Sequence, residues 1–157
     1  MRRFEREADG SFVALADDAE IGVLTTLARQ IAELLTERSP SDPAVLRLLP
    51  DAYADDAEAA SEFRRFTEAD LAARKASNAQ TVVETLESTG DDGRIRVEAS
   101  QAIAWLKTLT DIRLVLAVRL DIDSEDDDDG RETDPMMRDV YDWLGFVQNS
   151  LVEALDA

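Results

Sequence analysis

The pattern of apolar and polar residues predicts a set of helices arranged around one long apolar segment, residues 98–121. Apolar side chains recur in it at steps of three and four, the spacing of one helix face, and further apolar residues fill other faces. The recurring residues are Ile103, Leu106, Leu109, Ile112, Leu116 and Leu120. Such a helix is buried on more than one side. Because Lys107, Asp111 and other charges interrupt the segment, we interpret it as a core helix of a soluble domain and not as a membrane span.

Amphipathic segments near both ends of the chain predict the helices that cover this core helix. Residues 17–38 carry an apolar stripe behind a capping aspartate, Asp17 or Asp18. Residues 135–156 carry a second stripe, which begins after Asp134. The last helix is therefore expected to lie against the core helix.

Residues 55–88 also have helical periodicity, but their apolar face is thin and rich in alanine. Thr67 and Asp70 have the spacing of a capping box, so two helices are predicted, residues 55–66 and 68–88. Alanine-rich helices approach their neighbours closely. Several charged residues are expected near the edge of the core, and they include Glu62, Arg64, Arg65, Arg74 and Lys75.

Two short runs in residues 1–16, joined by an Asp-Gly turn, predict a β-hairpin. Residues 94–97 alternate in the same way and predict a third strand. The fold class that follows is mainly α: an antiparallel helical bundle around residues 98–121, with a small antiparallel β-sheet. A length of 157 residues, 45% of them hydrophobic, predicts one domain over residues 1–157.

The composition narrows the function classes. Because the sequence has no cysteine and no histidine, it excludes disulfides, thiol nucleophiles, cysteine or histidine zinc sites and Ser-His catalysis. A non-enzymatic protein without a cofactor is therefore favoured. The first residues contain no apolar stretch of the kind found in signal peptides, so a cytoplasmic location is expected.

The net charge of −18 restricts which classes of molecule can bind this protein. A strongly negative surface repels phosphate backbones and anionic lipid head groups. Direct binding to nucleic acid or to a membrane is therefore not expected, whereas a basic or mixed-charge protein is a suitable partner.

Residues 122–134 are predicted to form a solvated acidic loop, because adjacent like charges repel each other. Four carboxylates match positions of a twelve-residue calcium loop. They are Asp121, Asp123, Glu125 and Glu132. Because Asp126 occupies the position where the bend of that loop requires glycine, no metal site is assigned there.

Two charged residues, Asp111 and Arg113, lie within the apolar core helix and need partners, since unpaired buried charges are costly. The candidate partners on other helices are Glu62, Arg64, Arg65 and Asp142. One interpretation is that these ion pairs only fix the packing of the helices. The other is that Arg64, Arg65, Asp111 and Arg113 form a pocket for a carboxylate or phosphate ligand.

Trp143 lies away from the apolar stripe of the last helix. It is either a second packing face or an exposed anchor, and exposed tryptophan is common at protein interfaces. Trp143 is thus a candidate contact to a partner protein or to a second copy of the chain.

Three segments carry a family resemblance, namely Trp105 to Leu114, Tyr141 to Leu144 and Glu62 to Arg65. On these residues the chain resembles an actinobacterial family of uncharacterised proteins, domain of unknown function number 2017, often encoded beside the ClpS protease adaptor. The chain departs from the family's Asn-Asp-Leu-Arg pattern, which Leu-Gly follows. The replacements are Thr110 for the asparagine, Ile112 for the leucine and Ala117 for the glycine.

The resemblance implies a mostly helical protein of the bacterial cytoplasm, with no known activity and a link to regulated proteolysis. Some members are labelled transcriptional regulators.

Three functions remain open on the sequence. The leading hypothesis is a non-enzymatic acidic module that binds another protein, either as a monomer or as a homodimer. The alternatives are a binder or hydrolase of small anions that uses the Arg/Asp cluster, and an acidic mimic of nucleic acid that acts on transcription indirectly.

Overall fold

The computed structural model describes residues 1–50, 61–120 and 135–157, and for residues 61–64 it describes the backbone only. The elements are β1 (Glu5–Arg6), β2 (Phe12–Leu15), α1 (Asp18–Glu37), α2 (Pro43–Leu48), α3 (Ser61–Glu87), β3 (Arg94–Val97), the 3₁₀ helix η2 (Ala99–Gln101), α4 (Ala102–Leu120) and α5 (Pro135–Asp156). The predicted fold class, mainly α with a small antiparallel sheet, is confirmed. None of the described helices is both long and apolar enough to cross a membrane.

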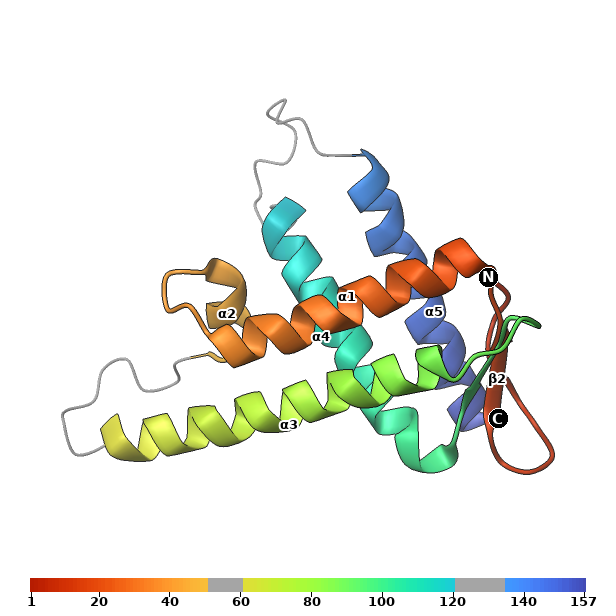
Figure 1. The fold of residues 1–157 in the computed structure, drawn as a ribbon, viewed down its shortest axis with the longest axis horizontal. Coiled ribbons are helices and arrows are strands. Elements are labelled where there is room, and N and C mark those ends of the chain that lie inside the picture. The colour runs from red at the N-terminus through yellow and green to blue at the C-terminus, as the bar shows by residue number, and fades with distance from the viewer. Residues whose placement is uncertain (51–60, 121–134) are drawn as a thin grey trace.

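The long helices form two antiparallel pairs that cross each other. α1 and α3 lie side by side in one pair, and α4 and α5 form the second pair behind them (Figure 1). The three-stranded sheet lies at one end of the molecule, near both chain termini. α4 contacts each of the other four helices, so its predicted central position is confirmed.

The start of α1 follows the local signal that predicted it. Asp17 accepts a hydrogen bond from the backbone N–H of Glu20 at 2.8 Å, and the Glu20 carboxylate accepts one from the N–H of Asp17 at 3.0 Å. This reciprocal capping box satisfies two backbone donors at the start of α1. Asp42 caps α2 in a similar way by accepting from the N–H of Ala44 at 2.9 Å.

The predicted break at Thr67 is wrong. α3 is one continuous helix over Ser61–Glu87. No glycine or proline occurs in this range, and the residues that follow Thr67 are mostly good helix formers. A capping-box spacing inside such a segment therefore does not end the helix.

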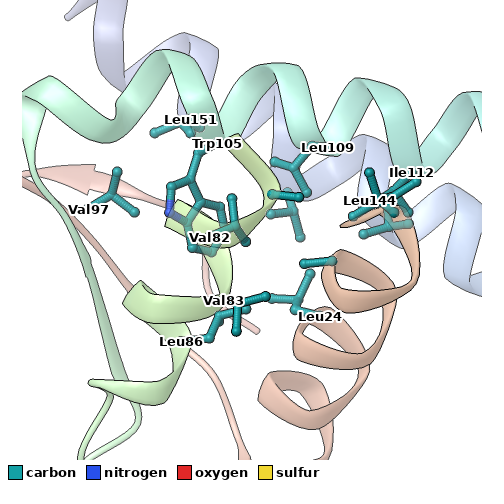
Figure 2. Packing of buried hydrophobic residues seen from close by; sticks show 14 of the residues in the cluster. Leu24, Val82, Val83, Leu86, Val97, Trp105, Leu109, Ile112, Leu144 and Leu151 are labelled. Carbon is teal, nitrogen blue, oxygen red and sulfur yellow. The ribbon is translucent and has the colours of Figure 1, made fainter. Parts of the chain in front are cut away.

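The core is centred on one face of α4. Trp105, Leu109 and Ile112 are each at most 2% exposed. Figure 2 shows these side chains surrounded by residues of the other long helices. The surrounding side chains include Leu24 of α1, Val82 and Val83 of α3, and Leu144 and Leu151 of α5. Full burial of one such side chain contributes about 1.5–3 kcal/mol, so this cluster accounts for much of the driving force for folding.

The sheet has the order β1-β2-β3, with β2 paired antiparallel to both neighbours. Phe4, just before β1, packs edge to face on Trp105 with 5.8 Å between ring centroids, and its N–H donates to Ser150 of α5 at 3.1 Å. These two contacts join the N-terminal hairpin to the helical core.

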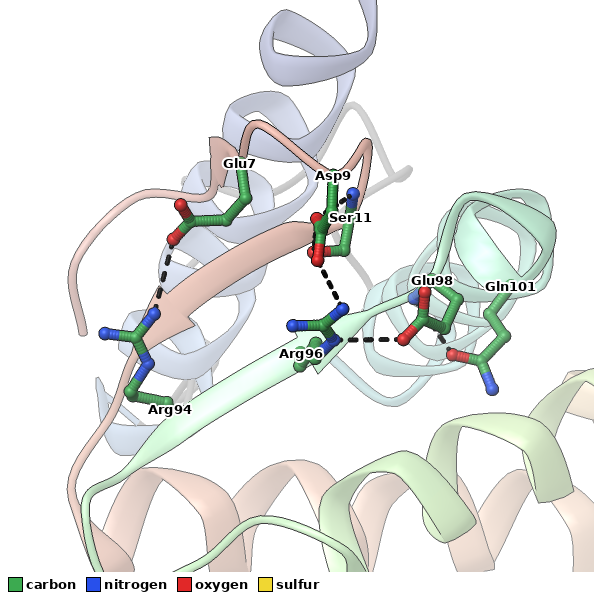
Figure 3. Close-up of polar contacts among 7 residues, drawn as sticks. All are labelled: Glu7, Asp9, Ser11, Arg94, Arg96, Glu98 and Gln101. Atoms are coloured by element: carbon green, nitrogen blue, oxygen red, sulfur yellow. Dashed lines mark hydrogen bonds and ion pairs between the residues drawn. The ribbon is translucent and has the colours of Figure 1, made fainter.

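Arginines of β3 form ion pairs with carboxylates of the N-terminal hairpin and of the residue that follows β3 (Figure 3). Arg96 donates to Asp9 and to Glu98. The pKa of Asp9 is lowered to about 2, mainly because the Ser11 side chain and backbone donate to its carboxylate, with Arg96 adding to the effect. Because these groups are exposed, they contribute to the local order of the turn more than to stability.

Candidate functional site

A groove with an apolar floor lies between α1, α4 and α5, and we call it the α1/α4/α5 groove. Its volume is about 540 Å³. The floor consists of Leu27, Ile31, Leu34, Ile112, Val115, Leu116 and Met137. The spacing of Leu27, Ile31 and Leu34 places them along one side of α1. Ile31 is fully buried, whereas Leu27 and Leu34 are half-buried at the groove.

The rim of the groove carries negative charge. Glu33 and Glu37 of α1 are exposed at its edge. Arg119, the one cation among the described lining residues, donates to both carboxylate oxygens of Asp42, at 2.9 and 3.0 Å. This bidentate hydrogen bond lowers the pKa of Asp42 and raises that of Arg119. Since Asp42 neutralises Arg119, the rim presents a net negative charge to an incoming ligand.

Asp111 pairs with Lys75, which is not one of its predicted partners. Asp111 is 3% exposed and its carboxylate accepts a hydrogen bond from the Lys75 ammonium of α3 at 2.8 Å. Burial raises the pKa of Asp111, and the nearby Lys75 only partly opposes this effect. Lys75 was expected near the edge of the core but was not among the candidate partners.

Arg113 extends in another direction, towards α5. Its guanidinium lies 4.8 Å from the centre of the Tyr141 ring and donates to the side-chain oxygen of Gln148 at 3.1 Å. A Cβ atom at Gly145 would come within 3.3 Å of this guanidinium, so the glycine makes room for it. Arg113 therefore joins α4 to α5 and does not accompany Asp111.

The predicted Arg/Asp cluster is thus not assembled in the described residues. Asp111 and Arg113 are two residues apart, which is a rotation of about 200° around the helix axis, so they lie on nearly opposite sides of α4. Arg65 is exposed near the start of α3, and the side chain of Arg64 lies outside the described part of the chain. One feature of the sequence could have indicated Lys75 as the partner of Asp111. Lys75 lies among the alanines of a close-packing helix face, Ala72, Ala76 and Ala79.

Trp143 is half-buried and packs against the core cluster, so it is not a fully exposed anchor. Its indole N–H is buried without a hydrogen-bond acceptor among the described residues. The four calcium candidates, Asp121, Asp123, Glu125 and Glu132, lie outside the described residues. Within the described ranges no group of three or more carboxylates could hold a metal ion.

The sequence matches one family model over residues 1–155, the family described as Domain of unknown function (DUF2017). The chain belongs to this family. The recognition made from the sequence is therefore confirmed, and the proximity to a ClpS gene stays a prediction. No solved structure matches the chain.

Several mycobacterial relatives of the chain are named as regulators. The chain is 35% identical to the putative oxidative stress regulator AosR of Mycobacterium leprae, over 75% of this chain and 60% of that protein. It is 28% identical to the oxidative stress regulators AosR of Mycobacterium tuberculosis and Mycobacterium bovis, over 93% of this chain and 74% of each relative. These relatives are named as regulators and not as enzymes. The chain spans about 60% of the length of the Mycobacterium leprae relative.

Proposed function

We propose that this chain is a regulatory protein that acts by binding a basic amphipathic helix of another protein in the α1/α4/α5 groove. The observation that carries the proposal is the combination of an apolar floor with an acidic rim in one cavity. The names of the mycobacterial relatives support a regulatory role.

The shape of the groove supports a helical ligand. Amphipathic helices bind in apolar grooves through side chains spaced three and four residues apart. The volume of about 540 Å³ is within the usual range for binding cavities, and it leaves room for several apolar side chains. Half-buried Leu27, Leu34 and Met137 would lose their remaining contact with water on binding, which is favourable.

The charges support a basic ligand. Glu33 and Glu37 lie one turn apart on the rim, so lysines or arginines beside the apolar face of a ligand helix could contact both. The net charge of −18 adds a long-range attraction, which mainly accelerates association.

The absence of cysteine restricts how such a regulator could respond to oxidants. These 157 residues contain no thiol to oxidise, so a thiol-disulfide switch within them is excluded. In the proposed mechanism the signal reaches the chain through its bound partner.

The test uses a labelled helical peptide with leucines on one face and lysines beside them, titrated by fluorescence anisotropy against the full chain. We expect Glu33→Lys/Glu37→Lys and Leu34→Glu to weaken binding at least about tenfold, since each removes a favourable contact and adds an opposing one. The matched controls are Asp91→Lys/Asp156→Lys, with the same change in net charge, and Val23→Glu, an exposed apolar position of α1 outside the groove.

Equal losses in Glu33→Lys/Glu37→Lys and Asp91→Lys/Asp156→Lys would mean that only overall charge attracts the peptide. A loss in Leu34→Glu no larger than in Val23→Glu would mean that the apolar floor does not bind it, and either result would refute the proposal. A photo-crosslinker at position 34 in the bacterial cell then identifies the natural occupant. A basic helix of another protein supports the proposal, including a helix from the machinery of regulated proteolysis. A second copy of the chain, or crosslinks only within one chain, would overturn it.

A further inference from the structure

A second cavity lies between α3 and α4, and we call it the α3/α4 cavity. It shares no lining residue with the α1/α4/α5 groove. Its volume is about 470 Å³, a common size for small-molecule sites. We propose that the α3/α4 cavity binds a small organic anion, with Lys107, Lys75 and Arg74 holding its carboxylate or phosphate group.

The charge of this cavity is opposite to that of the chain as a whole. The sequence contains only two lysines, Lys75 and Lys107, and both line the cavity together with Arg74. The one carboxylate of the lining is Asp111. Because Asp70, outside the lining, pairs with Arg74, three cations face two carboxylates and leave one excess positive charge, in a chain with 35 acidic and 17 basic residues. Such a site concentrates anions that the rest of the surface repels.

Each cation has donors left for a ligand. Asp111 accepts from the Lys75 ammonium at 2.8 Å, which fixes Lys75 beside α4 and leaves two of its three N–H groups. Arg74 contacts Asp70 of its own helix through Nε at 3.1 Å, and its two terminal nitrogens remain. Lys107 is exposed and makes no ion pair with any residue in the described ranges.

The remaining lining defines the rest of the ligand. Asn78 adds a neutral hydrogen-bonding group, while Leu71 and Leu106 supply apolar surface. A charged head alone would leave this apolar surface in water. The lining therefore fits an anion with a short apolar body, and the fixed Lys75–Asp111 pair preorganises its binding site.

The test follows backbone amide signals of the full chain by NMR during titration with three probes, phenyl phosphate, benzoate and uncharged benzyl alcohol. We expect phenyl phosphate or benzoate to shift signals of residues around the cavity, and benzyl alcohol to shift them much less. Phenyl phosphate binding more tightly than benzoate would assign a phosphate ligand, and the reverse order a carboxylate ligand.

The variant Arg74→Gln/Lys107→Gln should weaken this binding about tenfold or more, since charge-assisted hydrogen bonds are lost. Both positions are exposed, so the fold should tolerate the change. The control Arg2→Gln/Arg138→Gln removes the same charge from exposed positions elsewhere and should leave the affinity unchanged. Shifts spread over all arginines, or equal affinities in the two double variants, would overturn the proposal. Neither outcome depends on the peptide groove.

Discussion

The buried ion pair between Lys75 and Asp111 gives a prediction whose size depends on pH. Replacing Lys75 by methionine keeps the length and the apolar stem of the side chain but removes the charge. Asp111, whose side chain is 4% exposed, is then left without its ammonium partner. Removing one partner of a buried pair commonly costs about 3–5 kcal/mol.

The ability of the carboxyl group to take up a proton limits this cost. In the variant, burial is opposed only by Lys107 and holds the folded-state pKa of Asp111 above its ordinary value of 3.8. A raised carboxyl pKa costs stability above the folded-state pKa, and the cost disappears as the pH falls towards the unfolded-state pKa. Protonating this carboxyl costs at most about 4 kcal/mol at pH 7 and about 1.6 kcal/mol at pH 5.

The free energy of unfolding of Lys75→Met should therefore be lower than that of the parent chain by about 2–3 kcal/mol at pH 7. The loss should be below about 1.6 kcal/mol at pH 5. Urea denaturation followed by circular dichroism at both pH values measures the difference. In Lys75→Met/Asp111→Asn the extra loss at pH 7 caused by the unpaired Asp111 should be absent, because no buried carboxyl group remains at this position.

Arg74→Met is the matched control, since it removes one positive charge from the neighbouring position of α3. Its ion pair with Asp70 joins two exposed side chains, so its loss should cost less than about 0.5 kcal/mol. If Lys75→Met costs no more than Arg74→Met, or costs the same at both pH values, the assignment of Lys75 as the partner of a buried Asp111 is refuted.

Two further predictions concern the turns at the sheet. Gly93→Ala should lower the free energy of unfolding by about 2 kcal/mol or more, because Gly93 has φ +69° and an added Cβ would lie 2.3 Å from the Ala16 carbonyl oxygen. Gly90→Ala, where the nearest atom is 3.7 Å away, should change it by less than about 0.5 kcal/mol, and similar losses would contradict the prediction. An NMR titration should find the Asp9 pKa at about 2 and find it raised in Ser11→Ala, whereas an unchanged pKa would exclude Ser11 as its main cause.

Most of the secondary structure followed from signals that act within a few residues. The cap at Asp17 holds a backbone donor that is close in sequence, so the sequence alone shows it. The sheet was also predictable, because residues 94–97 alternate in the same way as the hairpin strands they join. The predicted break at Thr67 failed because a cap competes with continued helix, and the alanine-rich residues around it favour the helix.

The candidate site was harder to predict, because it depends on how the helices cross. The sequence showed that Asp111 needed a partner but not which helix would face it. Asp111 faces α3, where Lys75 reaches it, and Arg113 faces α5. The α1/α4/α5 groove was not predicted, since Glu33 and Glu37 look like ordinary solvated residues in the sequence. Whether the acidic segment binds a metal ion stays a prediction.

The polar contacts of α4 explain where its apolar surface remains open. Towards α3, the Lys75–Asp111 pair joins the two helices beside the α3/α4 cavity, and towards α5 the Arg113–Gln148 hydrogen bond joins α4 to α5. Small residues allow both, since Ala72 and Ala76 bring α3 close and Gly145 makes room for the guanidinium. Val115 and Leu116 lie on the side of α4 that faces the groove, where Val115 is half-buried and Leu116 is buried. Asp111, Arg113 and Arg119 of α4 already bind neighbouring elements, so the groove has an apolar floor and takes its negative charge from α1. This division favours a partner that combines apolar and basic groups over one that binds by charge alone.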